Sequence, residues 1–451
     1  MTPFLKEQLT TIQSKLASSF DLVYRQLVIQ DVHALLIFLS SLTDNATLVS
    51  LIEGMTVTSA YDITLTFYPG SVDCLSDVSE AILRVLSGQC LVILDQQKSY
   101  YLIESRHYPS RMTAEPEVER SIRGAHDGFV ENILCNVGLL RRRIRDENLS
   151  ITLQKEGSKT HTDIAYAYIK NQVDYDILHD FIHRLNSITQ GEVLSEHQFV
   201  ELLYGKTWNP YPHVRYTERP DICAFHLLQG YLIVLVDNCP NAIILPTTFF
   251  EQTKQIEEYT QTTIIALFTR IIRYIGIVFS IYLLPLWIAL LMDQNPTLLQ
   301  LPMKEVHPFT FGFQIILADI VVEWIRQSLI HTPSILSGIM SFVAVFLLGD
   351  LAIELGAYTK EILIMVALCN IGNLLTPSYE LSLANKIFRI AIGFLALWFG
   401  SVGFFIGVYL HILVLLSTKT MKYPYLYPFI PFSYKEWKRL LFGKIIKVDK
   451  K

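Results

Sequence analysis

The sequence predicts an α/β module of two similar subdomains followed by an all-α helical transmembrane domain. Three observations support this fold class. The first 260 residues have the mixed charge of a globular chain, whereas long apolar runs begin near Tyr274. One run, residues 274–292, has 19 residues without a charge, enough to cross a hydrocarbon core of roughly 30 Å. Two segments of the first half also resemble each other.

The internal repeat lies in the α/β half. LSGQCLVILDQQKSYYLI (Leu86 to Ile103) aligns with LQGYLIVLVDNCPNAIIL (Leu228 to Leu245) at a constant offset of 142 residues, which matches Gly88 with Gly230. Each copy reads as a helix end, a glycine turn, a strand, an aspartate-centred hairpin and a second strand. The repeat predicts two similar subdomains, although two unrelated hairpins would also give so weak an identity by chance.

Composition sets the expected boundaries. We expect the first subdomain at residues 1–110, a charged linker helix region at 111–150 and the second subdomain at 151–260. The transmembrane domain is expected at 261–418 and a basic cytoplasmic tail at 419–451. The opening MTPFLKEQLTTIQSKLASSF lacks the apolar segment of a secretory signal, so we expect the α/β module to remain in the cytoplasm.

The linker contains a cluster of arginines at the end of an expected amphipathic helix. Arginines at a helix C-terminus complement the helix dipole and pair with carboxylates. We therefore predict salt bridges, within or between subunits, in preference to nucleic-acid contact, and the net charge of −5 agrees with that choice. The residues predicted to form them are Glu115, Glu117, Glu119, Arg141, Arg142 and Arg143.

Hydropathy gives the candidate membrane segments. The four expected spans are residues 274–292, 309–329, 336–355 and 388–416. Residues 362–375 are too few to cross comfortably and suggest a re-entrant piece, and 388–416 is long enough to tilt or extend beyond the bilayer. Lys and Arg flank both ends of the domain, so the positive-inside rule predicts both ends in the cytoplasm and an even number of crossings. Six short crossings remain an alternative.

The second of these segments carries charges on one face. Asp319, Glu323 and Arg326 stand at i, i+4 and i+7, and Asp350 and Glu354 stand at i, i+4 in the next segment. Charges facing lipid would each cost roughly 2.5 to 3.5 kcal/mol, so they should face protein or water. One interpretation is an intramolecular ion pair or a helix lying flat at the interface. The other is a hydrated ion pathway, where the carboxylate excess would favour cations.

Signatures of catalysis and of cofactor or metal binding are missing from the sequence. Gly205-Lys206-Thr207 lacks the earlier glycine of a phosphate-binding loop, and His179 and His183 lack an HExxH pattern. Six cysteines lie far apart without CxxC spacing. We therefore expect no enzyme, no cofactor and no metal site.

Several separated blocks resemble one known family. They are Glu115-Pro116, IRGAHDGFVENILCNVGLLRRRI (Ile122 to Ile144), GSKTHTDIAYAYI (Gly157 to Ile169), TPSYELSLANKIFR (Thr376 to Arg389) and PYLYPFIPF (Pro424 to Phe432). Because these blocks occur in order along nearly the whole chain, the chain is identified as a member of the GerA family of spore germination proteins, resembling its A-type subunits. The family tends to have an ExxxExxRE helix in the membrane. Asp319 and Gln327 replace its first and last acidic residues here.

The resemblance implies a multi-pass protein of the inner membrane of bacterial endospores, with its α/β module and tail on the core side. It also implies a ring-shaped homo-oligomer that conducts ions early in germination beside other germination membrane proteins. We therefore predict a non-enzymatic, ion-conducting subunit with Asp319, Glu323, Arg326, Asp350 and Glu354 as candidates for its pathway. Two alternatives remain, a non-conducting membrane scaffold and a secondary transporter subunit.

Overall fold

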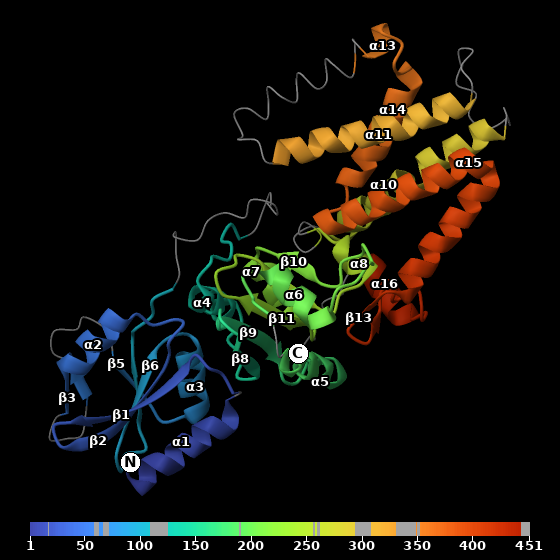
Figure 1. Cartoon of the computed structure of the whole chain (residues 1–451). Coiled ribbons are helices and arrows are strands. Elements are labelled where there is room, and N and C mark those ends of the chain that lie inside the picture. Colours follow the sequence, from blue (N-terminus) through green and yellow to red (C-terminus); the bar gives the residue numbers. More distant parts are fainter. Residues whose placement is uncertain are drawn as a thin grey trace. The chain divides into compact units, whose positions relative to one another are not determined.

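The structure, a computed structural model, forms two compact units (Figure 1). The α/β unit contains Met1–Thr207 and Val214–Thr247, and the helical unit contains Trp208–His213 and Thr248–Lys451. The structure describes residues 1–16, 18–57, 63–65, 72–108, 125–188, 191–255, 258, 262–293, 308–330, 349 and 352–442.

The first half of the α/β unit is a five-stranded antiparallel sheet with helices. Its strand order is β1-β2-β6-β7-β5, and its buried residues include every position of β6 and β7. In chain order the elements are α1 (Pro3–Lys15), β1 (Leu22–Ile29), β2 (Val32–Leu39), α2 (Asn45–Gly54), β3 (Met55–Val57), β4 (Ile63–Leu65), β5 (Val72–Leu75), α3 (Val78–Leu86), β6 (Cys90–Leu94) and β7 (Tyr100–Ile103). β3 and β4 form a separate two-stranded ribbon.

The second half of the α/β unit is another five-stranded antiparallel sheet, in the order β10-β12-β11-β9-β8. Its long hairpin β8–β9 pairs Leu149 with Ile169 at one end and Glu156 with Thr162 at the other. The elements are α4 (Ile133–Arg143), β8 (Leu149–Glu156), β9 (Thr162–Ile169), α5 (Tyr175–Asn186), α6 (Glu196–Tyr204), β10 (Arg215–Thr217), α7 (Pro220–Leu227), β11 (Leu232–Val236) and β12 (Ala242–Leu245).

The two halves share one topology. Replacing β1, β2, β5, β6 and β7 by β8, β9, β10, β11 and β12 turns one strand order into the other. The glycine turns match as well, because Gly88 and Gly230 have φ values of 96° and 90°. Each hairpin aspartate contacts the start of the helix that opens its half: Thr2 Oγ1 donates to Asp95 (2.6 Å) and the Ile133 amide donates to Asp237 (3.2 Å). The predicted pair of similar subdomains is confirmed.

Among its described residues, the helical unit contains three helices long and apolar enough to cross a membrane, α10, α11 and α15. Its described elements are α8 (Phe249–Gln252), α10 (Thr263–Met292), α11 (Pro308–Ile330), α13 (Ala352–Glu354), α14 (Lys360–Leu374), α15 (Tyr379–Ser417), β13 (Lys419–Thr420), β14 (Tyr423–Pro424) and α16 (Tyr434–Phe442). The expected re-entrant piece at 362–375 corresponds to α14. Most of the expected span at 336–355 lies outside the described residues.

The long final segment differs from the expected single tilted helix. α15 is interrupted at Gly400, whose φ of 58° and ψ of −140° are non-helical (Figure 1). Phe388 and His411 are twenty-three positions apart and would lie roughly 35 Å apart on a straight helix. Their ring centroids are 4.6 Å apart. The chain therefore reverses at Gly400 and forms a helical hairpin, with arms at 379–399 and 401–417.

Glycines permit this reversal and the close packing around it. The amide of Ser401, at the start of the second arm, donates to the Asp293 carboxylate (3.2 Å). A Cβ on Gly407 would lie 3.0 Å from Ile392 of the first arm. The length and apolar character of this segment are evident from its residues. A single glycine inside an apolar run does not reveal a turn, because many membrane helices contain glycine.

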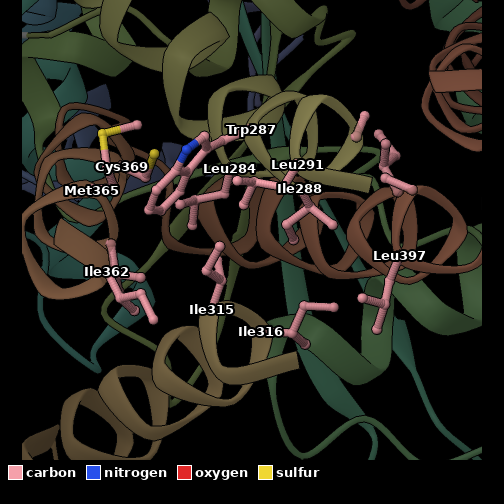
Figure 2. Packing of buried hydrophobic residues seen from close by; sticks show 14 of the residues in the cluster. Leu284, Trp287, Ile288, Leu291, Ile315, Ile316, Ile362, Met365, Cys369 and Leu397 are labelled. Carbon is pink, nitrogen blue, oxygen red and sulfur yellow. The ribbon is translucent and has the colours of Figure 1, made fainter. Parts of the chain in front are cut away.

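An apolar core holds α10, α11, α14 and α15 together (Figure 2). Trp287 is its largest side chain, with 1% of its surface exposed, and its ring meets Phe311 edge-on. α10 and α14 approach so closely that a Cβ on Gly372 would lie 2.6 Å from the Gly276 carbonyl oxygen. Small residues allow such backbone contact between membrane helices.

Candidate functional site: a buried charge network

The predicted charged face of α11 lies against α14 and α15. Its innermost member, Asp319, has 2% of its surface exposed. Arg389 of α15 donates to both Asp319 oxygens, from Nε to Oδ2 (3.0 Å) and from Nη2 to Oδ1 (2.8 Å). This two-pronged geometry suits a planar guanidinium and a carboxylate, and it fixes the distance between the two helices.

Asn370 of α14 completes the inner end of the network. Its Nδ2 donates to Asp319 (3.0 Å), while its Oδ1 accepts from both Arg389 (3.1 Å) and Lys386 (3.1 Å). Lys386 Nζ also lies 3.6 Å from Asp319 Oδ1. An amide can satisfy an acid and two cations at once because it offers both donors and an acceptor.

α10 contributes a backbone carbonyl to the same network. Arg389 Nη1 donates to the Ser280 oxygen (2.9 Å). This contact lies one turn before Pro285, which lacks an amide hydrogen and interrupts the hydrogen-bond ladder of α10. The inner network therefore joins all four helices of the core.

The outer end of the network is built around Glu323. It accepts from Arg326 Nη2 (2.8 Å), Lys386 Nζ (3.0 Å) and Gln327 Nε2 (2.9 Å). The Arg326 guanidinium also lies over the Tyr379 ring, 5.2 Å from its centroid. Exposure of the side chains rises outward, from 3% for Asp319 to 15% for Glu323 and 23% for Arg326.

The expectation of a carboxylate excess on this face is wrong for the described residues. Asp319 and Glu323 meet three cations, Arg326, Lys386 and Arg389. Of the other two carboxylates predicted for the pathway, Glu354 is exposed at the end of α13 and Asp350 lies outside the described residues.

Sequence reasoning missed Lys386 and Arg389. Both lie in the first arm of α15, at i and i+3, at the start of a long apolar run. That spacing on one helix face is the signal that could have paired them with the acidic face of α11. The partner helix could not be identified from the sequence, because Lys386 is 63 residues from Glu323 and Arg389 is 70 residues from Asp319. Contacts between residues so far apart in the chain are set by the tertiary fold.

Little space remains beside the inner pair. A cavity of about 10 Å³ lies between Asp319, Arg389, Pro285 and Gly393. A volume of this size holds roughly one water molecule. The inner network is therefore a packed junction.

The linker arginines lie in the α/β unit and join its two halves. Arg141 has 2% of its side chain exposed and donates to both oxygens of Asp21, which is fully buried, at 3.2 Å each. Burial by itself would raise the pKa of Asp21, but the Arg141 charge and the hydrogen bonds from Arg141, Ser19 and Ser41 lower it below its ordinary value.

The other two linker arginines have different partners. Arg143 donates to both oxygens of Asp127 (2.5 and 2.7 Å), and the Arg142 guanidinium lies 5.2 Å from the centre of the Tyr108 ring. The glutamates predicted as partners, Glu115, Glu117 and Glu119, lie outside the described residues.

The two histidines weighed as metal ligands, His179 and His183, are both exposed on α5. Within the described part of the chain, no group of three or more His, Cys, Asp or Glu side chains is placed to hold a metal ion. Lys206, from the incomplete phosphate-loop pattern, lies 3.9 Å from Glu201.

Comparison with known proteins gives the same family that the separated sequence blocks resemble. The family described as Bacillus/Clostridium GerA spore germination protein matches residues 10–451. Stage V sporulation protein AF of Bacillus subtilis (strain 168) is 37% identical over 93% of this chain and 88% of its own length. The sequence of the segment Val214 to Glu251 is interpreted as similar to that protein, and the match along the chain agrees with this interpretation.

Two further matches, one a curated protein and one a crystal structure, carry spore germination in their names. Spore germination protein KA of Bacillus subtilis (strain 168) is 26% identical over 98% of this chain and 85% of its own. The crystal structure of the N-terminal domain of the A subunit of the Bacillus megaterium spore germinant receptor GerK3 is similar at 23% identity and a TM-score of 0.42, over 55% of this chain and 97% of that one. The chain, with its paired α/β subdomains and apolar helices, belongs to the GerA family of spore germination proteins.

Proposed function

We propose that this protein is an ion-conducting subunit of spore germination that assembles into a ring-shaped homo-oligomer beside germinant receptors. In this proposal it resides in the inner membrane of the endospore, with the α/β unit and the tail on the core side. Family membership supports the general role, and the apolar helices support the membrane location. The proposal contains no enzymatic step.

The rise in exposure along the charged face of α11 carries this proposal. The inner pair, Asp319 and Arg389, is sealed, and the space beside it holds roughly one water. Glu323 and Arg326 retain 15% and 23% exposure. We therefore assign the ion pathway to a surface between copies of the chain, where the outer end of the face meets water.

Glu323 is the group that we assign to a permeating cation. It is the more exposed of the two carboxylates in the described network, and it is held in place by Arg326, Gln327 and Lys386. Three cations surround two acids, so the network as a whole repels a cation. In this proposal the Glu323 carboxylate, the more exposed of the two, offsets that repulsion at the outer end of the face.

Purified full-length protein in planar bilayers tests the proposal. We expect cation current from the native chain and a several-fold smaller current after Glu323→Gln, because the pathway loses its exposed carboxylate. Glu53→Gln, at an exposed position of α2 in the α/β unit, is the matched control and should leave the current unchanged. Equal currents from native protein and Glu323→Gln would contradict the assignment of Glu323.

A non-conducting scaffold is the second candidate. The charges of the network neutralise one another within one chain, which favours a scaffold because such pairs serve to hold helices together. The paired residues are Asp319, Glu323, Lys386 and Arg389. The same planar-bilayer measurement distinguishes a scaffold from a conducting subunit, because a scaffold gives no ion current whatever salt or lipid is used.

A secondary transporter subunit is the third candidate. The shortness of the segment 362–375 favours it, because broken membrane helices often form binding sites, but it would need inverted repeats that the sequence does not display. In the structure this segment belongs to α14, which runs without interruption from Lys360 to Leu374.

A further inference from the structure

A second feature of the helical unit is an apolar cavity of about 280 Å³, separate from the charge network. It lies between α10, the second arm of α15 and the segment after it, close to the lower limit of roughly 300 Å³ for ligand sites. Its inner lining includes Ile277, Ile281 and Leu415, and its aromatic lining includes Phe249, Phe250 and Phe429.

The polar groups at the inner end of this cavity are already used. The Tyr282 hydroxyl bonds to His411 Nδ1 (2.7 Å), and the Tyr211 hydroxyl bonds to His411 Nε2 (2.5 Å). His411 has 1% of its surface exposed. Because both ring nitrogens of His411 are occupied, the imidazole has no hydrogen bond left for a ligand at the inner end of the cavity. This lining disfavours a polar solute such as an amino acid or a sugar.

The rim of the cavity consists of residues that a membrane would cover. Val278 of α10 is 50% exposed and Phe429 is 44% exposed, and both line the cavity. α10 is long and apolar enough to cross a bilayer, and the second arm of α15 is apolar as well. The medium at this rim would therefore be lipid, and the solute that a bilayer supplies to an apolar cavity at highest concentration is an acyl chain.

A basic helix lies beside the same cavity. Leu440 of α16 lines it, and α16 contacts α10. Lys435 and Lys438 of α16 are exposed, three positions apart and so on one side of the helix. Basic amphipathic helices at membrane surfaces attract anionic lipid headgroups.

We infer that the helical unit binds one anionic phospholipid, with an acyl chain in this cavity and the headgroup near Lys435 and Lys438. The inference goes beyond the proposed ion pathway, because it concerns other helix faces and does not require conduction. The bound lipid would occupy the space between α10 and the second arm of the hairpin. It would therefore stabilise the arm that presents His411 to Tyr211 and Tyr282.

Lipid retention by the full-length protein tests this inference. The protein is reconstituted in vesicles of phosphatidylcholine containing one-fifth phosphatidylglycerol, extracted in detergent, washed, and analysed for phospholipid per chain by mass spectrometry. We expect retained phosphatidylglycerol enriched over its share in the vesicles. Retention of detergent alone, or of both lipids in vesicle proportion, would overturn the inference.

Variants locate the binding. Leu415→Phe fills the cavity and should lower retention on the order of tenfold, since each methylene kept from burial costs about a factor of four. Val278→Phe, at the rim, is the second filling variant in case the buried change prevents folding. Val402→Phe enlarges a residue of the same arm that is 65% exposed and does not line the cavity, so it is the matched control. Equal losses in filling and control variants would contradict a specific site.

The headgroup is tested separately. Lys435→Gln combined with Lys438→Gln leaves the cavity intact, so total retained lipid should persist while the preference for phosphatidylglycerol over phosphatidylcholine falls several-fold. An unchanged preference would overturn the assignment of the two lysines. Because every readout is bound lipid, a failure of the ion pathway would leave these results unaffected.

Discussion

Two buried aspartate–arginine pairs, one in each unit, use the same chemistry in different surroundings. In the α/β unit Asp21 and Arg141 have 0% and 2% side-chain exposure, and in the helical unit Asp319 and Arg389 have 3% and 2%. Each arginine bonds both carboxylate oxygens. Each also donates to a backbone carbonyl, Leu149 in one case and Ser280 in the other.

The pairs differ in what surrounds them. Asp21 also accepts from the Ser41 hydroxyl (2.8 Å), and the pair closes a junction between two sheets that each contain fully buried strands. Asp319 belongs to a network with a second cation, Lys386, and joins four helices that share one apolar core. Removing one partner should therefore cost more in the helical unit, where two cations lose a neutralising charge and water enters with difficulty.

The largest effect is expected from Asp319→Ala. It leaves Arg389 and Lys386 without their inner carboxylate, and breaking a buried pair costs about 3–5 kcal/mol. We expect a value at or above the upper end of this range, seen as a marked fall in the unfolding temperature of the purified full-length protein. Glu354→Ala removes an exposed carboxylate of the same unit and is the control. A similar small effect from both variants would show that the network has little influence on stability.

A smaller effect is expected from Asp21→Ala. Arg141 loses its partner but keeps the Leu149 carbonyl, and local separation of the two subdomains would admit water, so the cost should be about 3 kcal/mol. Hydrogen exchange is the suitable measurement, because the faster exchange should be confined to β1, β8 and α4. Asp73→Ala, at an exposed position of β5, is the matched control. Faster exchange across the whole α/β unit would contradict a junction between separately stable halves.

The smallest effect is expected on the loss of stability in acid. The folded pKa of Asp21 lies below its ordinary value of 3.8, so the folded state binds fewer protons there than the unfolded state. The stability contributed by ionised Asp21 is therefore complete well above pH 3.8 and is lost as the pH falls through the folded pKa. A single group changes stability by at most about 1.4 kcal/mol per pH unit. Asp21→Asn should therefore reduce the slope of the free energy of unfolding against pH, between pH 5 and 2, by up to about 1.4 kcal/mol per pH unit. An unchanged slope would show that the folded pKa of Asp21 is not lowered.

Much of the fold followed from local patterns. The 142-residue offset that aligns Gly88 with Gly230 in the sequence also aligns α3 with α7, β6 with β11 and β7 with β12 in the structure. Turn glycines, apolar strands and helix starts are set by residues close in sequence, and such signals survive in each copy. The acidic face of α11 was predictable in the same way, from the spacing of Asp319, Glu323 and Arg326.

The sequence by itself therefore determined the two related α/β subdomains, the apolar helices and the family. Only the tertiary structure decided that 379–417 folds back at Gly400 and that Lys386 and Arg389 neutralise the acids of α11. The reason is physical. Helix and strand patterns depend on neighbours a few residues away, whereas the partner of a buried charge depends on which helices pack together, and many alternative packings bury the same apolar residues.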